Sequence, residues 1–142
     1  MPLPESIHLE IVTPEQRLVN EVVDEVILPG SEGSLGVLPG HTPLLTTLGI
    51  GGLTYRRGAT RRHLAIARGF AEVLPDRVSV LAEIAERAEG IDRERALKAR
   101  ERAVARLRGR TAEAGFERAQ VALQKAIIRI QLSEGIGPNE PS

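Results

Sequence analysis

Basic side chains recur at helical spacing in the carboxyl-terminal half of the chain. They stand three or four residues apart, at Arg95, Lys98, Arg102 and Arg106. The surrounding segment, residues 87–110, carries nine basic and four acidic residues, which gives it a net charge of +5 although the whole chain is neutral. Arginine makes paired hydrogen bonds with carboxylates and phosphates. The pattern therefore predicts a surface for an anionic partner.

Three interpretations of this basic segment are open from the residues alone. It is a solvated helix face if Glu94 and Glu101, which are interleaved with the arginines, only pair with them in water. It binds a protein or a nucleotide if the guanidinium groups are used for recognition. It binds a nucleic acid if positive charge alone is sufficient for that binding. The segment has no aromatic side chain on which a base could stack.

Motifs for self-contained catalysis are absent from the sequence. No glycine-rich loop ends in the Lys-Ser/Thr pair of a P-loop. The histidines His8, His41 and His63 lie far apart, without the spacing of a helical metal site. The serines have no nucleophile-elbow context. The chain has no cysteine, which excludes disulfides and thiolate metal sites and permits a reducing compartment. We therefore expect a non-catalytic protein.

Targeting and membrane-spanning segments are not predicted either. The start of the chain, MPLPESIHLE, lacks the basic region and apolar run of a signal peptide. No run of about 18 consecutive apolar residues is present to span a bilayer.

Two amphipathic helices are predicted to carry the basic side chains. Asp92 is a suitable N-cap for the first, and apolar residues at helical spacing form its inner stripe: Ala96, Ala99, Ala103 and Leu107. A turn is expected at residues 109–111. The second helix has the stripe Phe116, Ala119, Leu123, Ala126, Ile127 and Ile130. Helices joined by so short a turn pack antiparallel.

Short strands are predicted before the helices. Ile7, Leu9 and Ile11 alternate with polar residues, as in a half-buried strand. Further strands are expected within residues 18–28, 44–55, 63–67, 70–74 and 78–81, around a corner rich in glycine and proline. A hairpin tip at Gly58 should hold its neighbouring arginines in water. This density of strands and turns predicts a β-sandwich or a barrel.

A family resemblance extends over nearly the whole chain as far as Ser133. Its longest pattern is GSLGVLPGHTP, residues 33–43, followed by GFAEV at 69–73, VSVLAE at 78–83 and IDRERA at 91–96. Together these resemble the epsilon subunit of F-type ATP synthases. The resemblance implies an amino-terminal β-sandwich (residues 1–86) and a carboxyl-terminal antiparallel two-helix hairpin (87–134). The glycines and prolines after residue 134 predict a flexible tail (135–142). One departure is Arg68, since many relatives have two glycines before the phenylalanine; an altered loop is expected there.

The resemblance also implies a function. The sandwich would lie on the rotor, or central stalk, against the gamma subunit and the ring of c subunits. It would help to couple proton or sodium translocation to ATP synthesis, while the alpha and beta subunits hold the catalytic sites. The chain would be peripheral, on the cytoplasmic face of the bacterial plasma membrane or its organellar equivalent. No nucleic acid partner is expected.

Regulation of ATP hydrolysis is implied for the hairpin. When extended, it would reach the alpha/beta catalytic head, where Arg100, Arg106 and Arg108 would meet acidic segments. His41 is a further candidate for partner binding.

A nucleotide site is implied by the run from Ile91 to Ala96, because Ile/Leu-Asp-x-x-Arg-Ala occurs in ATP-binding members of the family. Asp92 would then face the adenine and Arg95 the phosphates. Arg102, two helical turns further along the same face, could touch the same triphosphate. Spacing alone adds Glu86, Lys125 and Arg129 as weaker candidates. ATP would be a regulatory ligand, with no cofactor required. The alternative is that Asp92 only caps the helix and Arg95 only faces solvent.

Two rival functions remain open beside this one. The first is a free-standing β-sandwich adaptor that uses the hairpin to bind another protein. The second is a nucleic-acid-binding protein that uses the basic helix.

Overall fold

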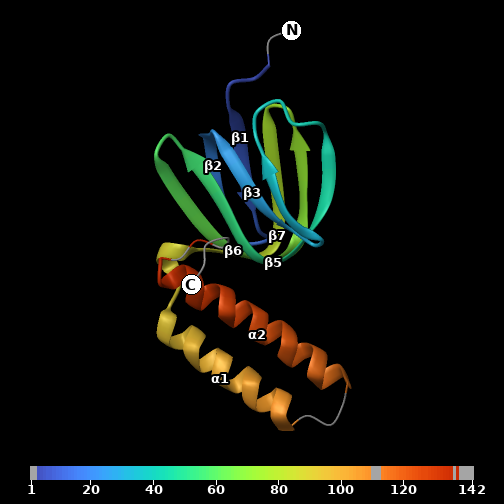
Figure 1. The fold of residues 1–142 in the computed structure, drawn as a ribbon, viewed down its shortest axis with the longest axis vertical. Helices are drawn as coiled ribbons and strands as arrows, with labels where there is room; N and C mark the ends of the chain where they lie inside the picture. The colour runs from blue at the N-terminus through green and yellow to red at the C-terminus, as the bar shows by residue number, and fades with distance from the viewer. Residues whose placement is uncertain (1–2, 110–112, 136, 138–142) are drawn as a thin grey trace.

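The computed structural model describes residues 3–109, 113–135 and 137. Within them, a β-sandwich is followed by two helices that lie side by side beneath it (Figure 1). The strands are β1 (Ile7–Val12), β2 (Arg17–Val23), β3 (Glu25–Gly30), β4 (Gly33–Val37), β5 (Leu44–Arg57), β6 (Thr60–Leu74) and β7 (Arg77–Arg87). The predicted fold class, an amino-terminal β-sandwich with a carboxyl-terminal helical hairpin, is confirmed.

The sandwich is one continuous sheet in the order β2-β1-β7-β6-β5-β3-β4, and it folds over so that its two layers face each other (Figure 1). β1 runs parallel to β7, with Leu9 opposite Val78, and every other neighbouring pair is antiparallel. The expected alternation of β1 is confirmed, because Ile7, Leu9 and Ile11 are fully buried.

β6 changes its buried face midway along its length. Leu64 and Ile66 point into the sandwich before residue 68, and Ala71 and Val73 do so after it. Since side chains alternate along a strand, this change of parity needs a local irregularity. Arg68 supplies it with a φ of 63°, a left-handed conformation that costs a non-glycine residue about 1–2 kcal/mol. The two strands predicted at 63–67 and 70–74 are therefore one strand, with the irregularity inside it.

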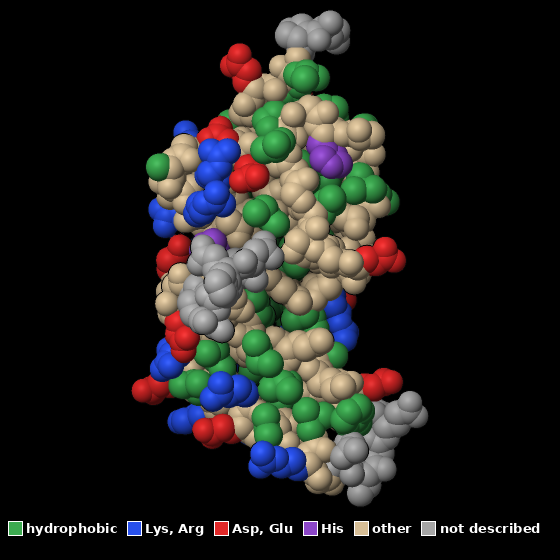
Figure 2. Space-filling model, viewed as in Figure 1, with side chains coloured by type: hydrophobic (Ala, Val, Ile, Leu, Met, Phe, Trp, Pro, Cys, Tyr) green, Lys and Arg blue, Asp and Glu red, His purple; other side chains and the backbone are tan. Residues whose placement is uncertain are grey.

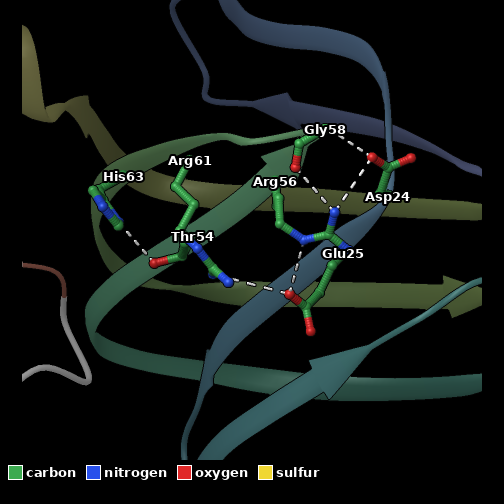
Figure 3. A network of polar contacts seen from close by, with 7 residues as sticks. All are labelled: Asp24, Glu25, Thr54, Arg56, Gly58, Arg61 and His63. Carbon is green, nitrogen blue, oxygen red and sulfur yellow. Dashed lines mark hydrogen bonds and ion pairs between the residues drawn. The ribbon is translucent and has the colours of Figure 1, made fainter.

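The hairpin between β5 and β6 turns at Gly58, as predicted, but its arginines are not simply solvated. The Arg56 side chain is only 30% exposed and lies 3.5 Å from both Asp24 and Glu25 (Figure 3). The Gly58 amide donates a hydrogen bond of 2.7 Å to Asp24. These contacts fasten the tip to the start of β3. The prediction of arginines in water is wrong for Arg56, because nearby carboxylates were not recognised from the sequence.

The helices are α1 (Arg93–Gly109) and α2 (Glu113–Ser133), preceded by a short 3₁₀ turn, η1 (Ala88–Gly90). They pack on each other, and α2 also contacts β5 and β6. Small buried side chains fill the contact between the helices: Ala96 and Ala103 from α1, Ala119 and Ala126 from α2. The predicted alanine stripe is thus found in the hairpin.

α2 has a second buried face that the sequence did not predict. Ile128 and Leu132 pack with Ala65 of β6 in a small apolar cluster separate from the core of the sandwich. Ile127, which was assigned to the inner stripe, is instead 48% exposed. The error arises because helical periodicity identified the face toward α1 and not the face toward the sheet.

Most of the predicted turn at residues 109–111, and most of the tail, lie outside the described residues. Of that tail, Gly135 has a φ of 79°, and the carbonyl oxygen of Gly137 accepts a hydrogen bond of 2.9 Å from Gln131. Neither described helix has a stretch long and apolar enough to cross a membrane.

Candidate functional site

A cavity of about 270 Å³ lies between the sandwich and the helical hairpin, and it is called the joint cavity below. Strands β5, β6 and β7 and both helices contribute to it. Its apolar lining comes from Ile50, Ala65, Ile66, Ala67, Ile84 and Ile128. Its charged lining is Glu86, Arg95, Lys125 and Arg129. The joint cavity therefore brings together four of the predicted nucleotide-binding residues.

A bidentate ion pair crosses this joint. Arg129 of α2 donates to both carboxylate oxygens of Glu86 on β7, with Nε–Oε2 at 2.8 Å and Nη2–Oε1 at 3.1 Å. The two side chains are 23% and 28% exposed. Paired geometry and partial burial make this a strong charge-assisted contact. It links the last strand of the sandwich directly to α2.

Arg95 and Lys125 are the other two cations of the joint cavity. No acceptor for either side chain is found among the described residues, whereas the charge of Arg129 is matched by Glu86. The joint cavity thus combines an apolar lining with two uncompensated positive charges. That arrangement suits a ligand with a flat, weakly polar part and an anionic part.

Asp92 and Ile91 have structural positions at the start of α1. The Asp92 carboxylate accepts a hydrogen bond of 3.1 Å from the Arg95 amide, so it caps the helix as predicted. Ile91 packs on the apolar cluster of Ala65, Ile128 and Leu132. Neither residue lines the joint cavity. The cap fixes the first turn of α1 and therefore the position of Arg95.

Arg102 is not brought to the joint cavity. It is exposed on α1, as are Arg100, Arg106 and Arg108, and none of the four has an ion pair within the described part of the chain. Figure 2 shows basic side chains distributed over the visible face of the helical part. The charges of α1 are therefore available to a partner.

His41 lies far from the helices. The loop that carries it lies beside Leu3, near the amino terminus at the opposite end of the sandwich (Figure 1). The His41 ring is half-buried, and its Nδ1 donates a hydrogen bond of 2.6 Å to the Thr42 carbonyl oxygen. His41 therefore belongs to a different surface from the joint cavity.

A second ion pair, with two hydrogen bonds to a single carboxylate oxygen, links the start of α1 to the end of α2. Arg93, at the start of α1, donates to Glu134 just beyond α2, with distances of 3.0 and 2.8 Å to the same oxygen. The sequence gives no local signal for this pair, because the partners lie 41 positions apart in the chain. The apolar lining of the joint cavity was not predicted either, because all of it except Ile128 comes from strands that no spacing rule connects to the helices. The described residues contain no group of acidic and histidine side chains that could hold a metal ion.

Comparisons with known proteins cover both parts of the chain. Residues 6–88 match the family model "ATP synthase, Delta/Epsilon chain, beta-sandwich domain", and residues 89–134 match "ATP synthase, Delta/Epsilon chain, long alpha-helix domain". A protein of Syntrophobacter fumaroxidans, named ATP synthase epsilon chain, is 52% identical over 130 residues, which is 92% of this chain and 97% of that protein. A protein of the same name from Nitratidesulfovibrio vulgaris is 49% identical over 127 residues, or 89% and 95% of the two chains.

A chain of a solved ATP synthase structure is also similar to this protein. A chain in the cryo-EM structure of Euglena gracilis mitochondrial ATP synthase, OSCP/F1/c-ring in rotational state 1, superposes with a TM-score of 0.82 and 28% identity. The match covers 95% of this chain and 84% of that chain. The resemblance carried by the glycine-rich run and the run from Ile91 is confirmed. The protein belongs to the ATP synthase delta/epsilon chain family.

Proposed function

We propose that this chain is a non-catalytic rotor subunit that couples ion translocation to ATP synthesis and regulates ATP hydrolysis through its helical hairpin. The regulatory part rests on the contact between the sandwich and the helical hairpin. There α2 rests on the sheet through a small apolar cluster and one bidentate ion pair. Such a contact is small enough to open and specific enough to close again.

Three partners follow for an assembled enzyme. The sandwich would bind the gamma subunit and the ring of c subunits, and the His41 loop at its far end is a suitable contact. The extended hairpin would present the exposed arginines of α1 to the alpha/beta head. The chain would then be peripheral at the cytoplasmic side of a bacterial membrane. The comparisons favour this function over the free adaptor and the nucleic-acid-binding protein.

Replacing the arginines of α1 tests the regulatory role. Exposed ion pairs contribute only about 0–1 kcal/mol each, so the effect should require several substitutions. We expect ATP hydrolysis by the assembled complex to rise several-fold when alanine replaces all five of Arg95, Arg100, Arg102, Arg106 and Arg108. The measurement is ATPase activity of a complex reconstituted with the variant.

Lysine at the same five positions is the matched control, because it keeps the charge. That variant should restrain hydrolysis nearly as well as the original chain. Unchanged hydrolysis in the alanine variant, with the subunit still bound, would rule out an electrostatic contact with the head.

Regulatory ATP binding is the second part of the proposal. The apolar lining of the joint cavity suits an adenine, and Arg95 and Lys125 supply positive charge for phosphates. The sandwich and both helices line the joint cavity, so it is complete only while the hairpin is folded down. ATP would therefore favour the folded-down state, since a ligand shifts an equilibrium through its preference for one conformation.

Replacing Arg95 by alanine should weaken ATP binding by about tenfold or more, the factor given by losing one charge-assisted hydrogen bond of about 1.5–3 kcal/mol. Calorimetric titration of the isolated subunit measures the affinity directly. Arg108→Ala is the control, because Arg108 is exposed near the other end of the same helix. Equal affinity in the Arg95 variant, or no heat at millimolar ATP in the original chain, would leave Asp92 as a helix cap and Arg95 as a surface charge.

A further inference from the structure

A second hollow, of about 620 Å³, adjoins the joint cavity, and it is called the outer hollow below. Lys125 lines both. The outer hollow is further lined by Arg68 of β6 and by Glu117, Arg118, Val121 and Ala122 of α2. Ala67, the residue next to Arg68 on the strand, lines the joint cavity. The two spaces therefore share the Lys125 side chain and border neighbouring residues of β6.

The outer hollow is positively charged. Arg68, Arg118 and Lys125 contribute three cations and Glu117 one anion. Within the described residues, the side chains of Arg68 and Lys125 have no acceptor. Positive charge thus continues from Arg95 in the joint cavity, past Lys125, to Arg68.

The backbone conformation of Arg68 accounts for the position of its side chain. Regular alternation after Leu64 and Ile66 would direct residue 68 into the core of the sandwich, where an unpaired guanidinium would be costly. The left-handed φ of 63° avoids this, and Arg68 is exposed at the outer hollow facing α2. Glycine would adopt this φ without strain. The fold therefore accommodates an arginine at a position that glycine fits better.

We propose that Arg68 is a further phosphate-binding residue, which contacts the distal phosphates of a nucleotide whose base lies in the joint cavity. The proposal rests on the ATP binding proposed above. A polyphosphate can pass from Arg95 over Lys125 into the outer hollow, because Lys125 borders both spaces. A single phosphate attached to the ribose is too short to do so. Arg68 should consequently distinguish nucleotides by the number of their phosphates.

The test compares ATP with AMP on the full-length subunit by calorimetric titration. In Arg68→Gly the guanidinium is lost and the backbone strain is relieved, so the melting temperature should not fall. We expect ATP affinity to fall about tenfold, the usual scale for one charge-assisted hydrogen bond, and AMP affinity to stay unchanged. Arg68→Lys keeps a positive charge and should retain part of the ATP affinity. Arg77→Gly, at an exposed site at the start of β7, is the control for loss of one surface charge.

The outcomes separate the two proposals. If the original chain binds ATP and the Arg68→Gly variant binds it equally well, the role of Arg68 is wrong while nucleotide binding stands. An equal loss of affinity for ATP and AMP would also overturn it, because it would indicate a general effect on the joint. If the original chain binds neither nucleotide, both proposals are wrong.

Discussion

Replacing Gly69 by alanine is expected to destabilise the sandwich by about 2–6 kcal/mol. Two costs add: a backbone conformation that L-residues rarely adopt and the overpacking of a site without space. Gly69 has a φ of 134°, and a Cβ atom there would lie 2.1 Å from the Leu81 carbonyl oxygen and 2.8 Å from the Ala82 Cα. Both are backbone atoms of β7, so no side chain can move away to relieve the clash. A domain with about 5–15 kcal/mol of total stability would lose a large part of it.

Chemical denaturation of the isolated subunit measures this change in the free energy of unfolding. Gly36→Ala is the matched control, because Gly36 also lies in a strand, has no positive φ and has no heavy atom within 4 Å of an added Cβ. The control should change stability by less than about 1 kcal/mol. A Gly69 variant as stable as the control would mean that β6 and β7 do not approach each other as described.

Breaking the ion pair between Glu86 and Arg129 should release the hairpin from the sandwich. Each single substitution to alanine leaves a partly buried charge without its partner, at a cost of about 1.5–3 kcal/mol for hydrogen bonds to charged groups. The double variant should cost less than the sum of the two single variants. Amide hydrogen exchange in α2 measures the opening free energy, and the four variants together form a double-mutant cycle.

The pair of Arg93 and Glu134 provides the comparison for this cycle. It also has two short contacts, but its side chains are 52% and 36% exposed, against 23% and 28% for Arg129 and Glu86. Its coupling energy should therefore stay near about 0–1 kcal/mol. Similar coupling in both pairs would show that burial at the joint adds nothing to the contact of Glu86 with Arg129.

Local periodicity predicted the elements of this fold and one face of each helix. The alternation at Ile7, Leu9 and Ile11 identified a buried strand, and the alanines of α1 identified its contact with α2. The same reasoning failed where a segment has two buried faces. Ile128 meets the sheet while Ala126 meets α1, and a single stripe could not describe both. Likewise, the change of face in β6 depends on the dihedral angles at Arg68, which no alternation pattern reveals.

The charged half of the joint cavity was more accessible to sequence reasoning than the apolar half. Lys125 and Arg129 are four residues apart, so helical geometry places them on one face of α2. Arg95 was identified by the run that begins at Ile91. The apolar lining at Ile50, Ala65 and Ile84 comes from three strands, and only the packing of α2 on the sheet brings them to the charged residues. Long-range packing of this kind leaves no trace in residue spacing.

The parallel pairing of β1 with β7 imposes an order on folding. His8 lies opposite Arg77, so β1, the first strand of the chain, pairs with β7, the last strand of the sandwich. Closing so long a loop costs conformational entropy before the contact can repay it. Until β7 is available, β1 has only β2 beside it, and an isolated two-stranded hairpin is marginal in water. During synthesis one edge of β1 therefore stays unpaired until almost the entire sandwich has been made. The residues of the helical hairpin, α1 and α2, are made directly after β7. The helices therefore pack onto a sheet that has only just formed.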